Sequence, residues 1–233
     1  MRRFQRILDD ILEKLSSQAK HVEFMVQQGL RALESHTVDS AKVRELETFV
    51  NLHEIEIEES CLNALALFQP TASDLRTIST VLKANGDLER IADLALNLTE
   101  RAESLLEFEE VKVPDELAEM VRYSLKMVQD ADLSLATRDV DLARDVCSRD
   151  DQLDAMNRDL IQSIASRMEE NPGNVKADLH IFSASRIIER IGDHATNIAE
   201  DVLHMVEGDI HRHQFKLPSV AMAIPVDKIA SQA

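Results

Sequence analysis

The sequence has few of the residues that build sheets, tight turns and disulfide frameworks. It contains no Trp, one Tyr, five Gly, five Pro and two Cys among 233 residues. Few aromatic residues and few turn formers, beside many Leu, Ile, Ala, Glu, Asp and Arg, favour long helices over strands. We therefore predict an all-α fold.

Basic residues are also scarce. The chain has 26 Lys and Arg against 43 Asp and Glu, which gives a formal net charge of −17 and a pI near 4.8. Proteins that bind a nucleic-acid backbone or an anionic membrane surface need clustered Lys and Arg. The charge therefore predicts that neither is a partner of this chain.

Cysteine pairs and long apolar runs are missing too. Cys61 and Cys147 stand alone, which fits a reducing compartment and neither a disulfide framework nor a thiolate zinc site. The first residues are basic over a short stretch only and lack the apolar core of a signal peptide. No run reaches the roughly 18 to 20 apolar residues of a transmembrane helix. The expected location is cytoplasmic, without membrane insertion.

An internal duplication is the clearest positive feature. ERIADLALNLTE, 89–100, recurs as ERIGDHATNIAE, 189–200, with the same residue at seven of twelve positions. Helical periodicity is interrupted at Gln69-Pro70 and again at Asn171-Pro172-Gly173, where proline disfavours helix in the residue before it. The pattern predicts helices over about 2–33, 38–68, 71–106, 115–137, 140–170 and 175–207.

These helices form two successive sets of three. We predict two tandem three-helix bundles related by duplication, 1–107 and 115–207, with a linker 108–114 and a C-terminal tail 208–233. In the last helix of each set, apolar residues alternate between spacings of four and three, as in a coiled-coil seam. These predicted core residues are Ala84, Leu88, Ile91, Ala95, Leu98 and Ala102, and Ala184, Ile188, Ile191, Ala195, Ile198 and Val202.

Acidic residues form a stripe beside each seam. Spacings of four, four and three place side chains on one helix face. The stripes are Glu89, Asp93, Asn97 and Glu100 in the first half, and Glu189, Asp193, Asn197 and Glu200 in the second. Like charges four residues apart destabilise a helix by about 0.2–0.5 kcal/mol per pair, so a stripe kept in both copies calls for some compensation, and a cation is the simplest candidate.

The second helix of each half has a stripe of its own. Its members are Glu47, Asn51, Glu54 and Glu58 in the first half, and Asp150, Asp154 and Asn157 in the second. The second and third helices are joined by a tight turn and should lie antiparallel, so the two stripes can face one another across a groove. Sets of oxygen ligands suit hard or borderline cations such as Mg²⁺, Mn²⁺ and iron. A solvated acidic face is the alternative interpretation.

The sequence contains few of the motifs that are typical of enzymes. It has no Gly-rich phosphate loop, no Gly-x-Ser-x-Gly and no His-Glu-x-x-His. A ferritin-type di-iron site needs Glu-x-x-His on two helices, and no histidine here has Glu three residues before it. A carboxylate-bridged metalloenzyme stays open because a carboxylate-held cation can activate water. The prediction is that the chain is not an enzyme.

Three strings stand out in the sequence: QPTASDLR, 69–76, DLERIAD, 87–93, and IIERIGDHATNIAE, 187–200. Together they resemble the PhoU family of regulators of bacterial phosphate uptake. The resemblance runs from about Arg2 to Glu207. It implies tandem three-helix bundles in which carboxylates bind metal ions, including multinuclear iron or zinc in some members. The matching positions are Glu47, Asn51, Glu54, Glu89 and Asp93, then Asp150, Asp154, Asn157, Glu189 and Asp193.

The resemblance also implies a role and partners. PhoU-like proteins link the phosphate ABC transporter, through its ATPase subunit, to a phosphate-sensing histidine kinase, and they restrain the phosphate response. A homodimer is common in the family. The implied metal is iron, zinc, manganese or magnesium. The alternative left open is an accessory regulator of another phosphate transporter, such as a sodium-phosphate symporter. In the first half, Glu47 stands where the family usually has Asp, Asn51 is neutral, and ERIAD replaces ERIGD.

Overall fold

Six long helices make up the protein. The computed structural model describes residues 2–35, 39–108 and 111–208. The helices are α1 (Arg2–Ser35), α2 (Ser40–Phe68), α3 (Ala72–Leu105), α4 (Asp115–Thr137), α5 (Val140–Glu170) and α6 (Val175–Glu207), with a short 3-10 turn, η1 (Pro172–Asn174), before α6. The described residues contain no strand. The all-α prediction of two three-helix units is confirmed, and the predicted helix ends are right to within about two residues.

Local sequence explains where the helices begin and end. Asp39 and Asp139 are the N-caps of α2 and α5, and their carboxylates accept hydrogen bonds from the backbone N–H of Lys42 and Leu142 at 3.1 and 3.0 Å. Gln69 ends α2 in the left-handed conformation, with φ 46°, immediately before Pro70. The start of α2 falls close to 36–38, which lie outside the described residues, as does the tail from 209 onward.

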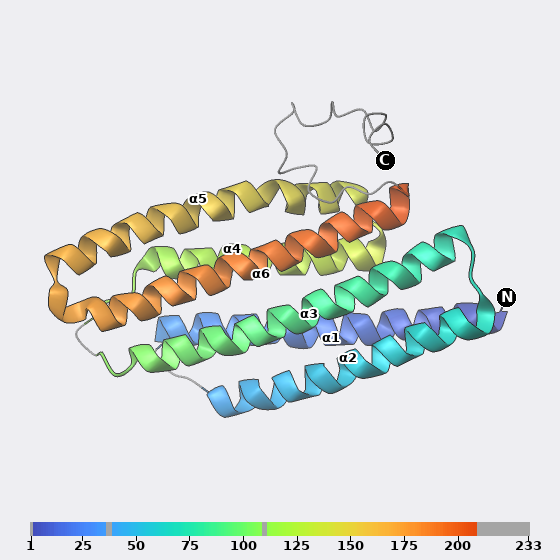
Figure 1. Ribbon diagram of the computed structural model, residues 1–233, viewed down its shortest axis with the longest axis horizontal. Helices are drawn as coiled ribbons and strands as arrows, with labels where there is room; N and C mark the ends of the chain where they lie inside the picture. The colour runs from blue at the N-terminus through green and yellow to red at the C-terminus, as the bar shows by residue number, and fades with distance from the viewer. Residues whose placement is uncertain (1, 36–38, 109–110, 209–233) are drawn as a thin grey trace, which may run out of the picture.

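The two halves pack along their third helices. The most extensive contact between elements is that of α3 with α6, and α1 also packs against α4. Helices α2 and α5 lie on opposite outer edges, α2 against α1 and α3, and α5 against α4 and α6 (Figure 1). The turn-linked helices α2 and α3, and likewise α5 and α6, are therefore neighbours, as the stripes require.

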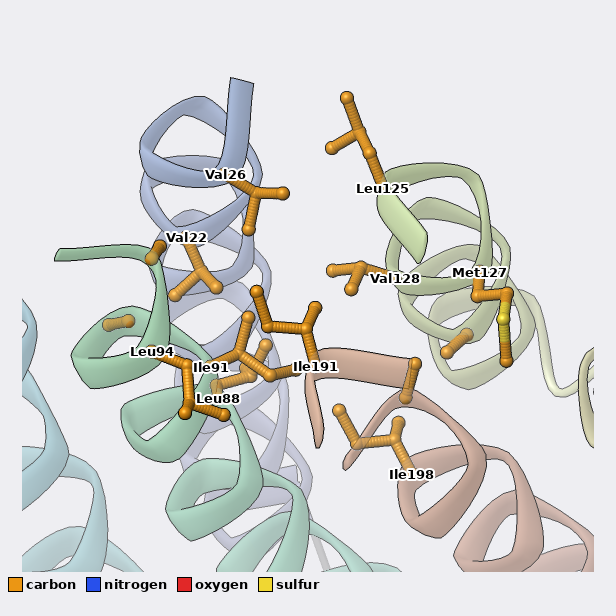
Figure 2. Packing of buried hydrophobic residues seen from close by; sticks show 14 of the residues in the cluster. Val22, Val26, Leu88, Ile91, Leu94, Leu125, Met127, Val128, Ile191 and Ile198 are labelled. Atoms are coloured by element: carbon orange, nitrogen blue, oxygen red, sulfur yellow. The ribbon is translucent and has the colours of Figure 1, made fainter. Parts of the chain in front are cut away.

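One apolar core spans both halves. All twelve predicted seam residues are buried. Figure 2 shows Ile91 of α3 and Ile191 of α6 meeting side chains from α1 and α4, including Val22 and Val128. Within the described part of the chain, no helix is long and apolar enough to cross a membrane.

Candidate functional site

The first-half stripes lie on the neighbouring helices α2 and α3. Glu47, Asn51 and Glu54 of α2 and Glu89 and Asp93 of α3 are all half-buried. These five predicted residues therefore border the core rather than the open surface, and Glu89 directly follows the seam residue Leu88.

Electrostatics shows that the two stripes share one environment. The pKa of Glu89 is raised, chiefly by burial, next by the charge of Asp93, and further by Glu54 and Glu47 across the groove, while Arg90 opposes these effects. The Arg90 guanidinium lies 3.5 Å from a Glu89 carboxylate oxygen and 3.7 Å from Asp93. Because the charges of Glu47 and Glu54 on α2 affect Glu89 on α3, the two stripes lie within electrostatic range of each other.

Asn51 has a buried side-chain oxygen without a hydrogen-bond partner among the described residues. Its Nδ2 donates to Glu47 Oε1 at 2.6 Å. The unpaired atom is Oδ1. Buried acceptors are nearly always satisfied, because leaving one unpaired costs about 1–3 kcal/mol. A cation coordinated by this oxygen would remove that cost.

The second-half stripes lie deeper. Asp150 and Asn157 of α5 are buried, at 4% and 3% exposed. Asp154 of α5 and Glu189 and Asp193 of α6 are half-buried. Asn157 Oδ1 and Glu189 Oε2 are buried acceptors without a hydrogen-bond partner in the described part of the chain. The second groove thus brings two such oxygens from facing helices, and its donor set fits a hard or borderline cation.

Like charges also meet in the second groove. Burial raises the pKa of Glu189 most strongly, and the charges of Asp193 and Asp154 raise it further, while Arg186 lowers it. Arg186 Nη1 lies 3.0 Å from Glu189 Oε1, so this basic side chain partly offsets the negative charge around Glu189. The pKa of Glu189 is therefore raised for the same reasons as that of Glu89, namely burial and the charges of neighbouring carboxylates.

Two further polar groups complete the second groove. Thr196 Oγ1 donates to Asp150 Oδ1 at 3.3 Å, and Glu200, on the predicted α6 stripe, is 6% exposed. Burial, followed by the charges of Glu200 and Asp150, raises the pKa of Cys147 to about 12, so its thiol stays protonated and does not act as a thiolate ligand. Sequence spacing alone gave no signal for Thr196 or Cys147.

As placed, the ligand candidates do not gather around one point. Over residues 2–35, 39–108 and 111–208, no three His, Cys, Asp or Glu side chains form a group that could hold a metal ion. Asn97 is exposed, and Asn197 Nδ2 donates to Asp87 Oδ1 at 3.3 Å, so Asn197 bonds to the other half of the protein. The same Asp87 oxygen lies 2.8 Å from Nδ1 of His194, which therefore bridges the halves.

Gly192, within the repeated motif, explains why one copy reads ERIGD and the other ERIAD. A Cβ at Gly192 would lie 2.2 Å from Leu153 Cδ2 on α5. The first half has Ala92 at the matching position and the shorter Val50 in place of Leu153, and both are buried. Each half therefore packs one larger and one smaller side chain at this crossing.

Gly192→Ala is expected to lower the free energy of unfolding by about 1 kcal/mol, because overpacking costs about 1–3 kcal/mol and the helix gains about 1 kcal/mol. Adding Leu153→Val should recover much of the loss in a double-mutant cycle measured by urea unfolding. Gly86→Ala is the control, since no atom lies within 4 Å of the added Cβ. Strict additivity of the Gly192 and Leu153 changes would refute this packing argument.

Duplicated three-helix bundles with acidic stripes facing each other in both halves define the structural class of this protein. Its sequence assigns it to one protein family within that class. The chain belongs to the PhoU domain family, whose model matches residues 15–102 and 117–202, one match in each half. The resemblance expected from the three motifs is confirmed.

Individual relatives are similar to this protein over most of its length. The "Phosphate-specific transport system accessory protein PhoU homolog" of Pseudomonas aeruginosa is 36% identical over 212 residues, which cover 90% of this chain and 88% of that protein. The crystal structure of PhoU from Pseudomonas aeruginosa has a TM-score of 0.85 and 37% identity, covering 88% of this chain and 100% of that one. The Streptococcus pneumoniae PhoU structure, with a TM-score of 0.82 and 21% identity, shares the fold.

Proposed function

We propose that this chain is a regulatory adaptor of phosphate uptake that represses the phosphate-starvation response when phosphate is ample. The observation that carries the proposal is the match to the Pseudomonas aeruginosa accessory protein over nine-tenths of the chain. Both halves match the family, so the duplicated architecture of such a protein is intact. The proposed role is non-enzymatic and is exerted from the cytoplasm.

The proposed partners are the ATPase subunit of the phosphate ABC transporter and a phosphate-sensing histidine kinase, with the chain acting as a homodimer. An adaptor of this kind works by binding one partner in one state better than in another, since only differential affinity shifts an equilibrium. Long rigid helices with large lateral faces suit that task, because they can meet two partners at once.

Deleting the gene is expected to derepress phosphate-starvation genes in cells grown with ample phosphate, because the repressing link between transporter and kinase is lost. A transcriptional reporter measures this, and wild-type protein supplied from a plasmid should restore repression. If the reporter stays repressed in the deletion strain, the regulatory proposal is wrong. Pull-down with the transporter ATPase then separates it from a role at another phosphate transporter.

We also propose that the facing stripes bind metal ions, the set being Glu47, Asn51, Glu54, Glu89, Asp93, Asp150, Asp154, Asn157, Glu189 and Asp193. Support comes from the raised pKa of Glu89 and of Glu189 and from the buried oxygens of Asn51, Asn157 and Glu189. Bound iron, zinc, manganese or magnesium would supply positive charge where carboxylates repel one another.

Replacing Glu189 and Asp193 together with Ala is expected to lower the metal content of the purified protein, because two carboxylates leave the second groove. Elemental analysis of protein purified without added metal measures the ratio. Arg190→Ala is the control, since Arg190 is exposed and adjoins Glu189 without belonging to the stripe. An unchanged ratio in the double variant contradicts the assignment, whatever the outcome of the gene deletion.

A further inference from the structure

The outward side of α2 carries a second row of apolar side chains. The buried residues of this helix, such as Val50 and Ile57, face α1 and α3. On the opposite side Leu52, Ile55 and Leu62 are 60%, 51% and 52% exposed. Helix α2 lies at the edge of the molecule, and its packing against α1 and α3 leaves this side uncovered (Figure 1).

The spacing of this row is that of a helix seam. Consecutive members alternate between four and three residues, the repeat with which two helices pack side by side. The row, which we call the outer row of α2, consists of exposed residues only: Thr48, Leu52, Ile55, Glu59, Leu62 and Ala66. Its geometry fits one further helix lying along α2.

The duplication supplies an internal comparison. The buried faces of α2 and α5 align when Val43 matches Val146, and Ile57 matches Leu160. In that alignment the outer row of α5 contains no large apolar residue: Asp151, Ala155, Arg158, Gln162, Ala165 and Glu169. The three-helix bundle therefore does not need an apolar outer row, and the row on α2 calls for a separate explanation.

The charge around the outer row of α2 indicates which kind of partner can bind there. From Glu45 to Phe68, α2 contains six Glu and no Lys or Arg. Glu59 lies in the row, and Glu56 and Glu58 flank it at positions that face a partner helix in a coiled coil; all three are exposed. Glu56 Oε2 lies 3.9 Å from Lys14 Nζ of α1, which offsets part of its charge, so Glu58 and Glu59 carry most of the argument. An acidic surface of this kind selects a basic partner.

A second copy of the chain fits poorly. In a parallel pair Glu59 would face Glu59. In an antiparallel pair centred on the row, Glu56 of one copy would lie beside Glu56 of the other, and Glu58 beside Glu58. Like charges held together at an interface are costly. An anionic membrane surface is repelled for the same reason.

We propose that the outer row of α2 is the docking surface for a basic amphipathic helix of a partner protein. The partner helix carries apolar residues at its seam, Lys or Arg at the flanking positions and one basic residue opposite Glu59. This inference goes beyond the proposed function, since it assigns a surface and a partner chemistry, and it does not depend on the metal stripes.

The first test uses a synthetic, fluorescently labelled peptide of about three heptads, with Leu at the seam, Lys at the flanking positions and one Lys set opposite Glu59. Titration with the full-length protein should give saturable binding by fluorescence anisotropy. Changing Leu52, Ile55 and Leu62 to Ser should weaken binding by about tenfold or more. The matched α5 variant, with Ala155, Arg158 and Ala165 changed to Ser, should bind as the wild type does.

Exchanging the charges of Glu59 and the facing peptide residue distinguishes binding along this seam from nonspecific electrostatic attraction. Glu59→Lys should weaken binding of the Lys peptide by about tenfold or more, and a peptide with Glu at the facing position should restore it. Gln162→Lys, the matched change on α5, should alter neither affinity. The substituted side chains are exposed except Ala155, which is half-buried and changes only to the similarly small Ser, so all variants should keep the wild-type unfolding midpoint.

Several results would overturn the proposal. They are absence of peptide binding, equal binding by the triple-Ser α2 variant, and failure of the charge exchange to restore affinity. Self-association in sedimentation that the triple variant abolishes would assign the row to a second copy. Binding to phosphatidylglycerol vesicles that the triple variant abolishes would assign it to a membrane. If the reporter stays repressed in the deletion strain, the regulatory proposal is wrong but the docking surface on α2 is unaffected. The two proposals can therefore fail separately.

Discussion

Replacing Arg167 with Ala is expected to lower the free energy of unfolding by about 3 kcal/mol, the lower end of the cost of breaking a buried ion pair. Arg167 Nη2 lies 3.0 Å from Oδ1 of Asp178, which is 1% exposed on α6. The same nitrogen donates to the Lys112 carbonyl oxygen at 3.2 Å. The Arg167 side chain is 28% exposed, so water can enter after its removal, which keeps the loss toward the lower end.

The first half of the chain provides the control for this pair. Where the second half has Arg167 and Asp178, the first half has Ala64 and Ile78, and both are buried. Combining Arg167→Ala with Asp178→Ile therefore imports a pair that already packs in the same fold. The double variant should recover most of the lost stability, because no buried charge remains. Urea unfolding of both variants measures this, and a single Arg167→Ala with wild-type stability would refute it.

Much of the fold was predictable because its determinants are local in sequence. The helix breaks at Pro70 and Pro172 depend on backbone geometry that a proline imposes wherever it stands. The seam on α3 and α6 follows from a spacing of four and three, and all of its residues are buried. Elements of this kind need no knowledge of how the helices are arranged.

That the acidic stripes of each half lie on neighbouring helices was predictable for a related reason. A tight turn makes its two flanking helices neighbours, so stripes on α2 and α3 had to share a groove, and those on α5 and α6 likewise. The raised pKa of Glu89 and that of Glu189 agree with this arrangement. Metal binding itself stays a prediction.

Contacts between the two halves could not be predicted from spacing. His194 directly follows the motif aspartate Asp193, and its ring bonds to Asp87 of the other half, a contact that residue spacing does not predict. Which helices of the two halves meet, and at what height, depends on packing of the whole core. The second apolar row of α2 was visible in the sequence, but a helix with two apolar sides has a weak amphipathic signal.

Asp132 is a second feature of the interface between the halves. It lies on α4, which packs against α1. Burial raises its pKa to about 6, with a further increase from the charge of Glu23 on α1 and an opposing effect of Lys20. The pKa of Glu23 is also raised, again chiefly by burial. Two acids thus face each other where the halves meet.

The sign of the pH dependence follows from that shift. The unfolded chain releases the Asp proton near pH 3.9, whereas the folded protein keeps it until about pH 6. Between those values the folded state binds more protons, so stability falls as pH rises through this window. A shift of this size corresponds to about 2–3 kcal/mol, and we take about 2 kcal/mol because the side chain is only half-buried and partly screened.

Asp132→Asn should remove this loss, since the amide carries no charge at any pH. Above about pH 7 the variant is expected to be about 2 kcal/mol more stable than the wild type, and below about pH 4 the two should be equally stable. Urea unfolding across this range, with chelator present, measures the difference. Asp151→Asn is the control, because Asp151 is exposed on α5. A stability difference that does not change with pH would mean that Asp132 is not the titrating group, because only a proton held more tightly in the folded state makes that difference grow between these two limits.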